Sequence, residues 1–149
     1  MHDLALTLLD VDTYQGVYAT DIAKLFSFID DRVADGERIP RGAVSQVLTL
    51  RQARGGTATG RGVLVPHAAV RRLPCSRLIH VQLLGVITVN TPDNIPVRDV
   101  LTLLVRYPPT LADHALLERI RDPYMSRILN ELLRLGQFAE VYARLVRRA

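Results

Sequence analysis

The chain has 149 residues, of which 48% are hydrophobic and 23% charged, and its formal net charge is +4. This length and composition are typical of one globular domain that buries a full core without disulfides or metals. Cys75 is the only cysteine, which excludes an intrachain disulfide and favours a reducing compartment. No apolar run approaches the roughly 20 residues of a membrane span, so we expect a cytoplasmic protein without direct membrane insertion.

The basic charge is carried almost entirely by arginine, since Lys24 is the only lysine. The pairs Arg71-Arg72 and Arg147-Arg148 could contact nucleic acid. However, the arginines are scattered along the chain instead of forming one stripe, and aromatic residues that could stack on bases make up only 5%. We therefore expect no nucleic-acid partner.

Helical spacing of apolar residues predicts two helices in the first half of the chain and three at its end. The N-terminal segment 1–17 shows no clear hydrophobic period. Thr20-Asp21 is a helix start and Gly36 a helix end, while Asp122-Pro123 is an N-cap followed by a first-turn proline. The predicted helices span residues 20–35, 40–54, 111–121, 124–135 and 137–147.

Short apolar runs between the two helical regions predict strands. The run Val100–Val105 is continuous and rich in β-formers, which is typical of a central strand covered on both faces. The other predicted strands are Val63–Val65, Leu78–Leu84 and Ile87–Val89. Helices, then strands, then helices predict an α/β fold, a mixed β-sheet covered by helices, with one domain over residues 1–149.

A glycine-rich stretch in the middle of the chain carries the functional signal. It runs from Gly55 to Gly62 and leads through a short apolar strand into Pro66-His67. Glycines can take positive φ and let backbone N–H groups converge on an anion, and the strand brings the imidazole of His67 to the edge of that site. A histidine there can accept a phosphoryl group. The same pattern also occurs as an ordinary loop with a structural histidine.

This stretch resembles the signature of the enzyme IIA domains of the phosphotransferase system (PTS), of the fructose/mannitol and nitrogen-regulatory type. From Arg51 to His67 the spacing follows the family pattern without a gap. The matching residues are Arg51, Gly55, Thr57, Gly60, Gly62, Pro66 and His67. The departures are Gln52 for Glu, Gly56 for Ser, Ala58 for Gly, Thr59 for Ile and Arg61 for Asn. The resemblance extends from about Thr20 to the C-terminus, and it identifies a divergent member.

The resemblance implies the enzyme IIA fold of this type and a phosphocarrier in which His67 takes a phosphoryl group from a histidine-containing carrier protein. The group would pass to a permease domain or remain as a regulatory mark. No cofactor or metal is implied, because the phosphoryl group arrives without a nucleotide. In the family a second histidine lies beside the phosphorylated one, and either Asp113 or His114 holds that place here. The residues expected to stabilise the phosphoryl group are Arg51, Thr57, His114, Gly60 and Gly62.

Two functions stay open at this point. The first is a phosphocarrier or phosphorylation-dependent regulator that uses His67. The second is an enzyme IIA-like binding module that regulates a transporter or another partner without phosphorylation of His67. Gln52 removes a carboxylate, and Arg61 adds a charge that could stabilise phosphate or repel a basic carrier protein. Arg51 is either a phosphate ligand or a residue that balances a helix C-terminus. His80, on a predicted strand, is interpreted as a hydrogen-bonded structural residue.

Overall fold

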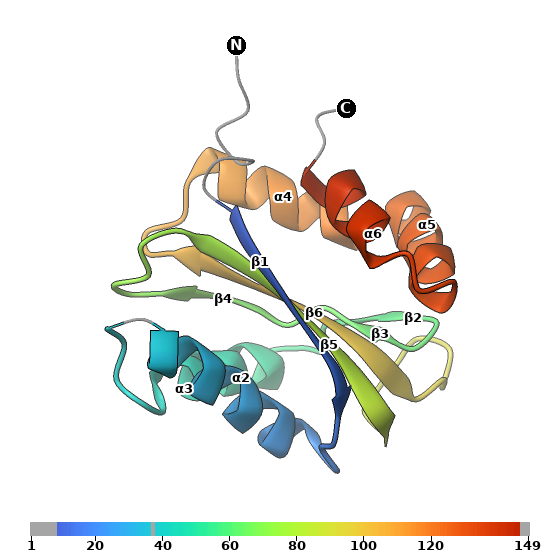
Figure 1. The fold of residues 1–149 in the computed structure, drawn as a ribbon, viewed down its shortest axis with the longest axis horizontal. Coiled ribbons are helices and arrows are strands. Elements are labelled where there is room, and N and C mark those ends of the chain that lie inside the picture. The colour runs from blue at the N-terminus through green and yellow to red at the C-terminus, as the bar shows by residue number, and fades with distance from the viewer. Residues whose placement is uncertain (1–8, 37, 147–149) are drawn as a thin grey trace.

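The computed structural model describes residues 9–36 and 38–146, which form a mixed β-sheet between two layers of helices (Figure 1). The predicted α/β class and the helix-covered sheet are confirmed. The strands are β1 (Leu9–Val17), β2 (Ala58–Gly60), β3 (Val63–Leu64), β4 (His67–Val70), β5 (Ser76–Ile87) and β6 (Val97–Arg106). The helices are α2 (Ile22–Gly36), α3 (Ala43–Ala53), α4 (Leu111–Arg121), α5 (Pro123–Arg134) and α6 (Phe138–Val146).

The central strand of the sheet is β6. The strand order is β1-β5-β6-β3-β2, and β4 also pairs with β6. β6 runs antiparallel to β5 and parallel to β3 and β4. Along β6, Val100 and Leu104 pack into one hydrophobic cluster, and Leu101 and Leu103 pack into the other. The run predicted as a central strand is therefore covered on both faces.

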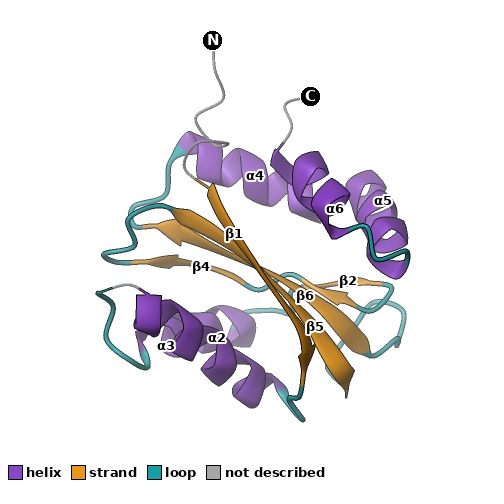
Figure 2. Ribbon diagram, in the orientation of Figure 1, coloured by secondary structure: helices purple, strands orange, loops and turns teal. Residues whose placement is uncertain are grey.

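The helices divide between the two faces of the sheet (Figure 2). α2 and α3 cover one face, and α4, α5 and α6 cover the other. All five predicted helices are present, with ends that differ from the prediction by three residues or fewer; residue 147 lies outside the described part. Asp21 accepts a hydrogen bond from the Lys24 amide at 2.8 Å, and Asp122 accepts one from the Met125 amide at 2.9 Å. The helix starts read from the sequence are thus real caps.

Four strands differ from the prediction, and two of them, β2 and β4, lie where no strand was predicted. β1 lies within the segment that showed no hydrophobic period, because it is an edge strand that pairs only with β5 and tolerates polar residues such as Asp12 and Gln15. β5 is one strand where two were predicted. Gly85 does not end it, and the pairing with β6 instead shifts register between Gln82 and Ile87.

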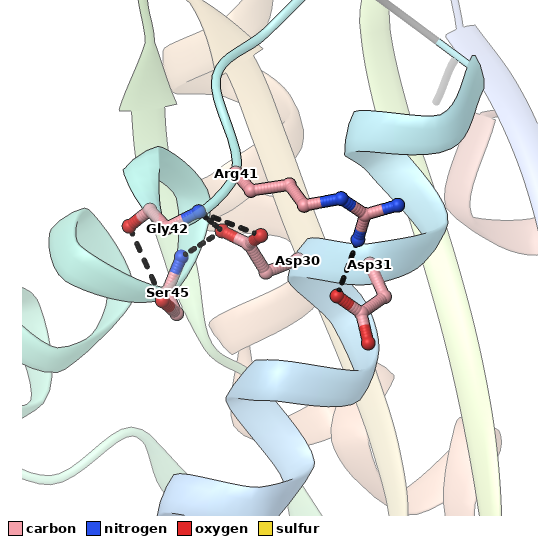
Figure 3. A network of polar contacts seen from close by, with 5 residues as sticks. All are labelled: Asp30, Asp31, Arg41, Gly42 and Ser45. Carbon is pink, nitrogen blue, oxygen red and sulfur yellow. Dashed lines mark hydrogen bonds and ion pairs between the residues drawn. The ribbon is translucent and has the colours of Figure 1, made fainter.

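The junction between α2 and α3 is held by a buried carboxylate (Figure 3). Asp30 on α2 accepts hydrogen bonds from the Gly42 amide at 2.9 and 3.1 Å and from the Ser45 amide at 2.8 Å. These amides belong to the start of α3, where Gly42 has no side chain to cap them. The neighbouring Asp31 pairs instead with Arg41 at 2.8 Å. These hydrogen bonds fix the start of α3, and they therefore also fix the position of the side chains at its C-terminal end.

Candidate functional site

His67 is the first residue of β4 and follows a break in the sheet. From Val63 to Val70 the chain runs along β6 in one register, with Val63 opposite Asp99 and His67 opposite Leu103. The strand is interrupted at Val65-Pro66, where proline has no N–H for the ladder. The His67 ring turns back toward the carbonyl of Val65, so that its Nδ1 lies 3.1 Å from that oxygen.

Both ring nitrogens of His67 have partners, and the partners fix the tautomer. A carbonyl oxygen only accepts, so Nδ1 carries the proton and donates it to Val65. Arg51, near the end of α3, donates from its Nε to Nε2 of His67 at 3.0 Å. The half-buried imidazole therefore directs the lone pair of Nε2 toward Arg51.

The environment keeps this imidazole neutral. Burial lowers the pKa of His67 below its ordinary value, and the charges of Arg51 and Arg121 lower it further, against the opposing effect of the Val65 hydrogen bond. Burial likewise lowers the pKa of Arg51, followed by repulsion from Arg121 and Arg54. A neutral imidazole is the nucleophilic form, so the lone pair on Nε2 is available to an electrophile once Arg51 moves aside.

We expect His67 to titrate below pH 6.5 and to be neutral at pH 7. The pKa of His67 is lower in the folded than in the unfolded protein. Above about pH 6.5 the imidazole is neutral in both states and does not affect the free energy of unfolding. As the pH falls toward the folded pKa, the unfolded protein binds the proton first, and the free energy of unfolding decreases. Arg121→Gln should raise the pKa of His67, as measured by NMR titration of its Cε1 proton. Arg134→Gln is the control, and an equal titration midpoint in both variants would contradict the role of Arg121.

A pocket of about 340 Å³ opens beside His67. The glycine-rich segment, the end of α3 and the corner between α4 and α5 form its walls. None of the described residues that line it is acidic. The polar residues of the lining are Arg51, Thr57, Thr59, Arg61, His67, Arg121, Ser126 and Arg127. Its charge is therefore strongly positive, as an anion site requires.

The glycine-rich stretch folds as a hairpin instead of an open loop. β2 and β3 pair antiparallel, and Arg61 and Gly62 make a two-residue turn with φ of 58° and 82°. Positive φ at both positions is characteristic of a type I′ turn. Asp93 accepts a hydrogen bond from the Arg61 amide at 2.7 Å. Gly60 and Gly62 do not line the pocket: a Cβ on Gly60 would lie 3.3 Å from the Asp93 carboxylate, and one on Gly62 3.3 Å from the Pro96 carbonyl. Both glycines shape the turn.

Thr57 lies in the pocket, and its hydroxyl proton is already used in a hydrogen bond within the protein. Its hydroxyl donates to Oε1 of Gln52 at 2.9 Å, and the residue is buried. Gln52 stands where the resembled family has glutamate. The departure thus preserves an acceptor for Thr57 without placing a negative charge in the pocket.

His114 lies in an adjoining apolar pocket of about 360 Å³, which also includes Arg51 and His67. The structure therefore brings Arg51, Thr57 and His67 together around one depression and places His114 in the next one. Asp113 lines the same apolar pocket, but its carboxylate is occupied. It accepts from the Thr110 amide at 2.8 Å and from the Ser76 hydroxyl at 2.7 Å. Of the two residues weighed for this place, His114 keeps a side chain that is free to act.

The sequence analysis missed the part of the pocket contributed by the corner between α4 and α5. Arg121 ends α4, and Ser126 and Arg127 lie near the start of α5. The Asp122-Pro123 signal predicted a helix start there, and basic residues beside it hint at an anion site. Only the packing of this corner against the sheet shows that it faces His67.

Two further findings bear on the chemistry. Among the described residues, no group of three or more His, Cys, Asp or Glu side chains is placed to hold a metal ion. No helix of the described residues is long and apolar enough to cross a membrane.

No family model matches the sequence, and no curated protein matches it either. Solved structures do match. Nitrogen regulatory protein IIA-Ntr from Neisseria meningitidis superposes with a TM-score of 0.71 at 19% identity, over 87% of this chain and 90% of that one. IIA mannitol from Escherichia coli has a TM-score of 0.58 at 15% identity, over 76% of this chain and 82% of that one. The complex of enzyme IIAMTL and phosphorylated enzyme IIBMTL from Escherichia coli has a TM-score of 0.63 at 14% identity, over 90% of this chain and 92% of that one. The chain therefore has the fold of the nitrogen-regulatory and mannitol-type IIA proteins of the PTS, as the glycine-rich stretch predicted.

Proposed function

We propose that this protein is a cytoplasmic phosphocarrier or phosphorylation-dependent regulator that accepts a phosphoryl group on Nε2 of His67. The donor is a histidine-containing carrier protein. The observation that carries the proposal is the state of His67: a neutral imidazole, its Nδ1–H fixed on Val65, with Nε2 directed at a positive pocket. The solved complex of enzyme IIAMTL with phosphorylated enzyme IIBMTL supports a IIB-type permease domain, or a regulated transporter, as the next partner.

In the proposed step, the lone pair of Nε2 attacks the phosphorus of the carrier's phosphohistidine. The old N–P bond breaks as the new one forms, and the carrier's imidazole leaves with the electron pair, neutral because its other nitrogen keeps a proton. His67 keeps its own proton on Nδ1, where the Val65 carbonyl stabilises the positive charge of the phosphorylated ring. For this attack Arg51 must first withdraw its Nε–H from Nε2. The same N–H, still on Arg51, then donates to a phosphoryl oxygen in a charge-assisted hydrogen bond.

The direct test is incubation of the protein with phosphoenolpyruvate, enzyme I and the carrier protein, followed by analysis for acid-labile, base-stable phosphate. We expect stoichiometric labelling of His67. Absence of label in the presence of fully phosphorylated carrier would contradict the proposal.

Arg61→Asn is expected to raise the rate of phosphoryl uptake by about threefold to tenfold at low ionic strength, since it removes a positive charge from the face that a basic carrier must approach. Arg72→Asn is a matched control: Arg72 is also exposed, also has positive φ (70° against 58° for Arg61), and does not line the pocket. Stopped-flow transfer from labelled carrier gives the rates. An equal rise in both variants would show that net charge, and not the place of Arg61, sets the rate.

A second function is favoured by one specific observation. Nε of Arg51 is hydrogen-bonded to Nε2 of His67, and its Nη1 donates to the Gly55 carbonyl at 2.9 Å, so the lone pair needed for attack is engaged. An enzyme IIA-like binding module that regulates a transporter or another partner would keep this arrangement permanently. If neither the wild-type protein nor Arg61→Asn takes up phosphate, this second function is the better one.

A further inference from the structure

The pocket beside His67 holds more positive charge than one phosphoryl group requires. Four arginines line it: Arg51, Arg61, Arg121 and Arg127. Arg51 alone contacts His67 and is the cation that a phosphoryl group on Nε2 would meet first. The other three come from the hairpin turn, the end of α4 and the start of α5. They extend the positive surface away from the imidazole.

These three arginines have no anionic partner among the described residues. Within residues 9–36 and 38–146, no ion pair and no side-chain hydrogen bond is found for Arg61, Arg121 or Arg127. By contrast, Arg134 at the other end of α5 pairs with Glu131. Unpaired like charges that share a pocket repel each other, and the charge of Arg121 lowers the pKa of both Arg51 and His67. A bound anion would relieve this repulsion.

Neutral donors complete the lining. Ser126 lies near the start of α5, whose N-terminus concentrates positive partial charge. Thr59 also belongs to the lining, and in the described part of the chain its Oγ1 is buried without a hydrogen-bond partner. The Asp122 carboxylate is not part of the lining and is bonded to the Met125 amide. The pocket thus offers positive charge and polar groups to an anion, and none of the described residues of its lining supplies one.

We propose that this pocket binds a small free molecule that carries two phosphate groups. One phosphate lies against Arg51 and covers the ring of His67, and the other is held by Arg61, Arg121 and Arg127. A volume of about 340 Å³ is at the lower end of the range for ligand pockets, and no Phe, Tyr or Trp side chain is among the described residues that line it. These features favour a diphosphate or a sugar bisphosphate over a nucleotide. The inference goes beyond the proposed function, since binding does not require phosphorylation of His67, but a bound ligand would cover Nε2 and block uptake.

Isothermal titration calorimetry with inorganic phosphate, pyrophosphate and fructose 1,6-bisphosphate tests this. We expect pyrophosphate or the bisphosphate to bind at least about tenfold more tightly than phosphate, since each added charge-assisted contact is worth that much or more. Arg127→Gln should weaken binding of the preferred ligand by about tenfold. Arg134→Gln, which removes the same charge from the same helix, should change it by less than about twofold. Arg61→Asn gives a second variant at an exposed turn if Arg127→Gln does not fold.

Three results would overturn the inference: equal affinity for phosphate and for both two-phosphate ligands, no effect of Arg127→Gln and Arg61→Asn, or tighter binding of a polyglutamate peptide than of pyrophosphate. The last result would identify an acidic protein surface as the ligand. His67→Gln separates this inference from the proposed function, because it removes the phosphoryl acceptor but leaves the three arginines. If the wild-type protein binds the two-phosphate ligand but takes up no phosphoryl group, only this inference is supported. If the wild-type protein takes up a phosphoryl group but does not prefer two phosphates, only the proposed function is supported.

Discussion

His67→Gln is expected to abolish phosphoryl uptake from the carrier protein, by at least about a thousandfold, while leaving the fold intact. A glutamine amide has no lone pair of comparable nucleophilicity, so no covalent intermediate can form. The loss of stability should be only about 1 kcal/mol, because His67 is half-buried at the start of β4 and belongs to neither hydrophobic cluster. Quantitative transfer from labelled carrier measures the first effect, and urea unfolding measures the second.

His114→Gln is the matched control, since it makes the same change at the histidine of the adjoining pocket. It should slow uptake without abolishing it, because His114 could supply only one of several contacts, worth about 1–3 kcal/mol. The assignment of His67 as the acceptor fails if His67→Gln still yields acid-labile phosphate. It is reversed if only His114→Gln removes the label.

The features that the sequence predicted well depend on neighbouring residues. The start of α5 could be predicted because Asp122 and Pro123 are adjacent and act within one turn. The grouping of Arg51, Thr57 and His67 was implied by the resemblance of this stretch to the enzyme IIA signature, and the structure brings the three residues to one pocket. Burial of Val100–Leu104 followed from the apolar character of the run, and Val105 at its end is partly buried.

The features that the sequence did not predict depend on contacts between distant segments. Asp30 caps α3 from another helix, so the sequence around the start of α3 carries no sign of it. The glycines of the signature were expected to converge on an anion, but pairing of β2 with β3 turns them into a hairpin. Arg121 and Arg127 reach the pocket only because the corner between α4 and α5 packs beside the hairpin. Much of the charge of the site therefore comes from tertiary structure.

A buried polar network joins β1, β5, β6 and α6. It lies on the face of the sheet that α4, α5 and α6 cover. His80 on β5 has no exposed surface, and its Nε2 lies 3.1 Å from Oδ1 of Asp99 on β6. Its Nδ1 lies 3.0 Å from the hydroxyl of Tyr142 on α6, which is also hydrogen-bonded to Thr13 on β1. Phe138 packs edge-on against the His80 ring. The interpretation of His80 as a hydrogen-bonded structural residue agrees with these contacts, since both ring nitrogens are satisfied inside the protein.

Asp99→Ala is expected to lower the free energy of unfolding by about 3 kcal/mol, because it leaves the Nε2–H of His80 buried without an acceptor. Asp31→Ala is the control: it removes a carboxylate from an exposed pair with Arg41 and should cost less than about 1 kcal/mol. Urea unfolding followed by circular dichroism gives both values, and a loss below about 1 kcal/mol for Asp99→Ala would show that His80 finds another acceptor.

The backbone amide of Asp99 donates to the Gly62 carbonyl at 3.0 Å, and Asp99→Ala keeps this amide, so the hairpin beside His67 stays hydrogen-bonded to β6. The folded fraction of Asp99→Ala should therefore take up phosphate at the wild-type rate, which separates the stability of the fold from the chemistry of the pocket.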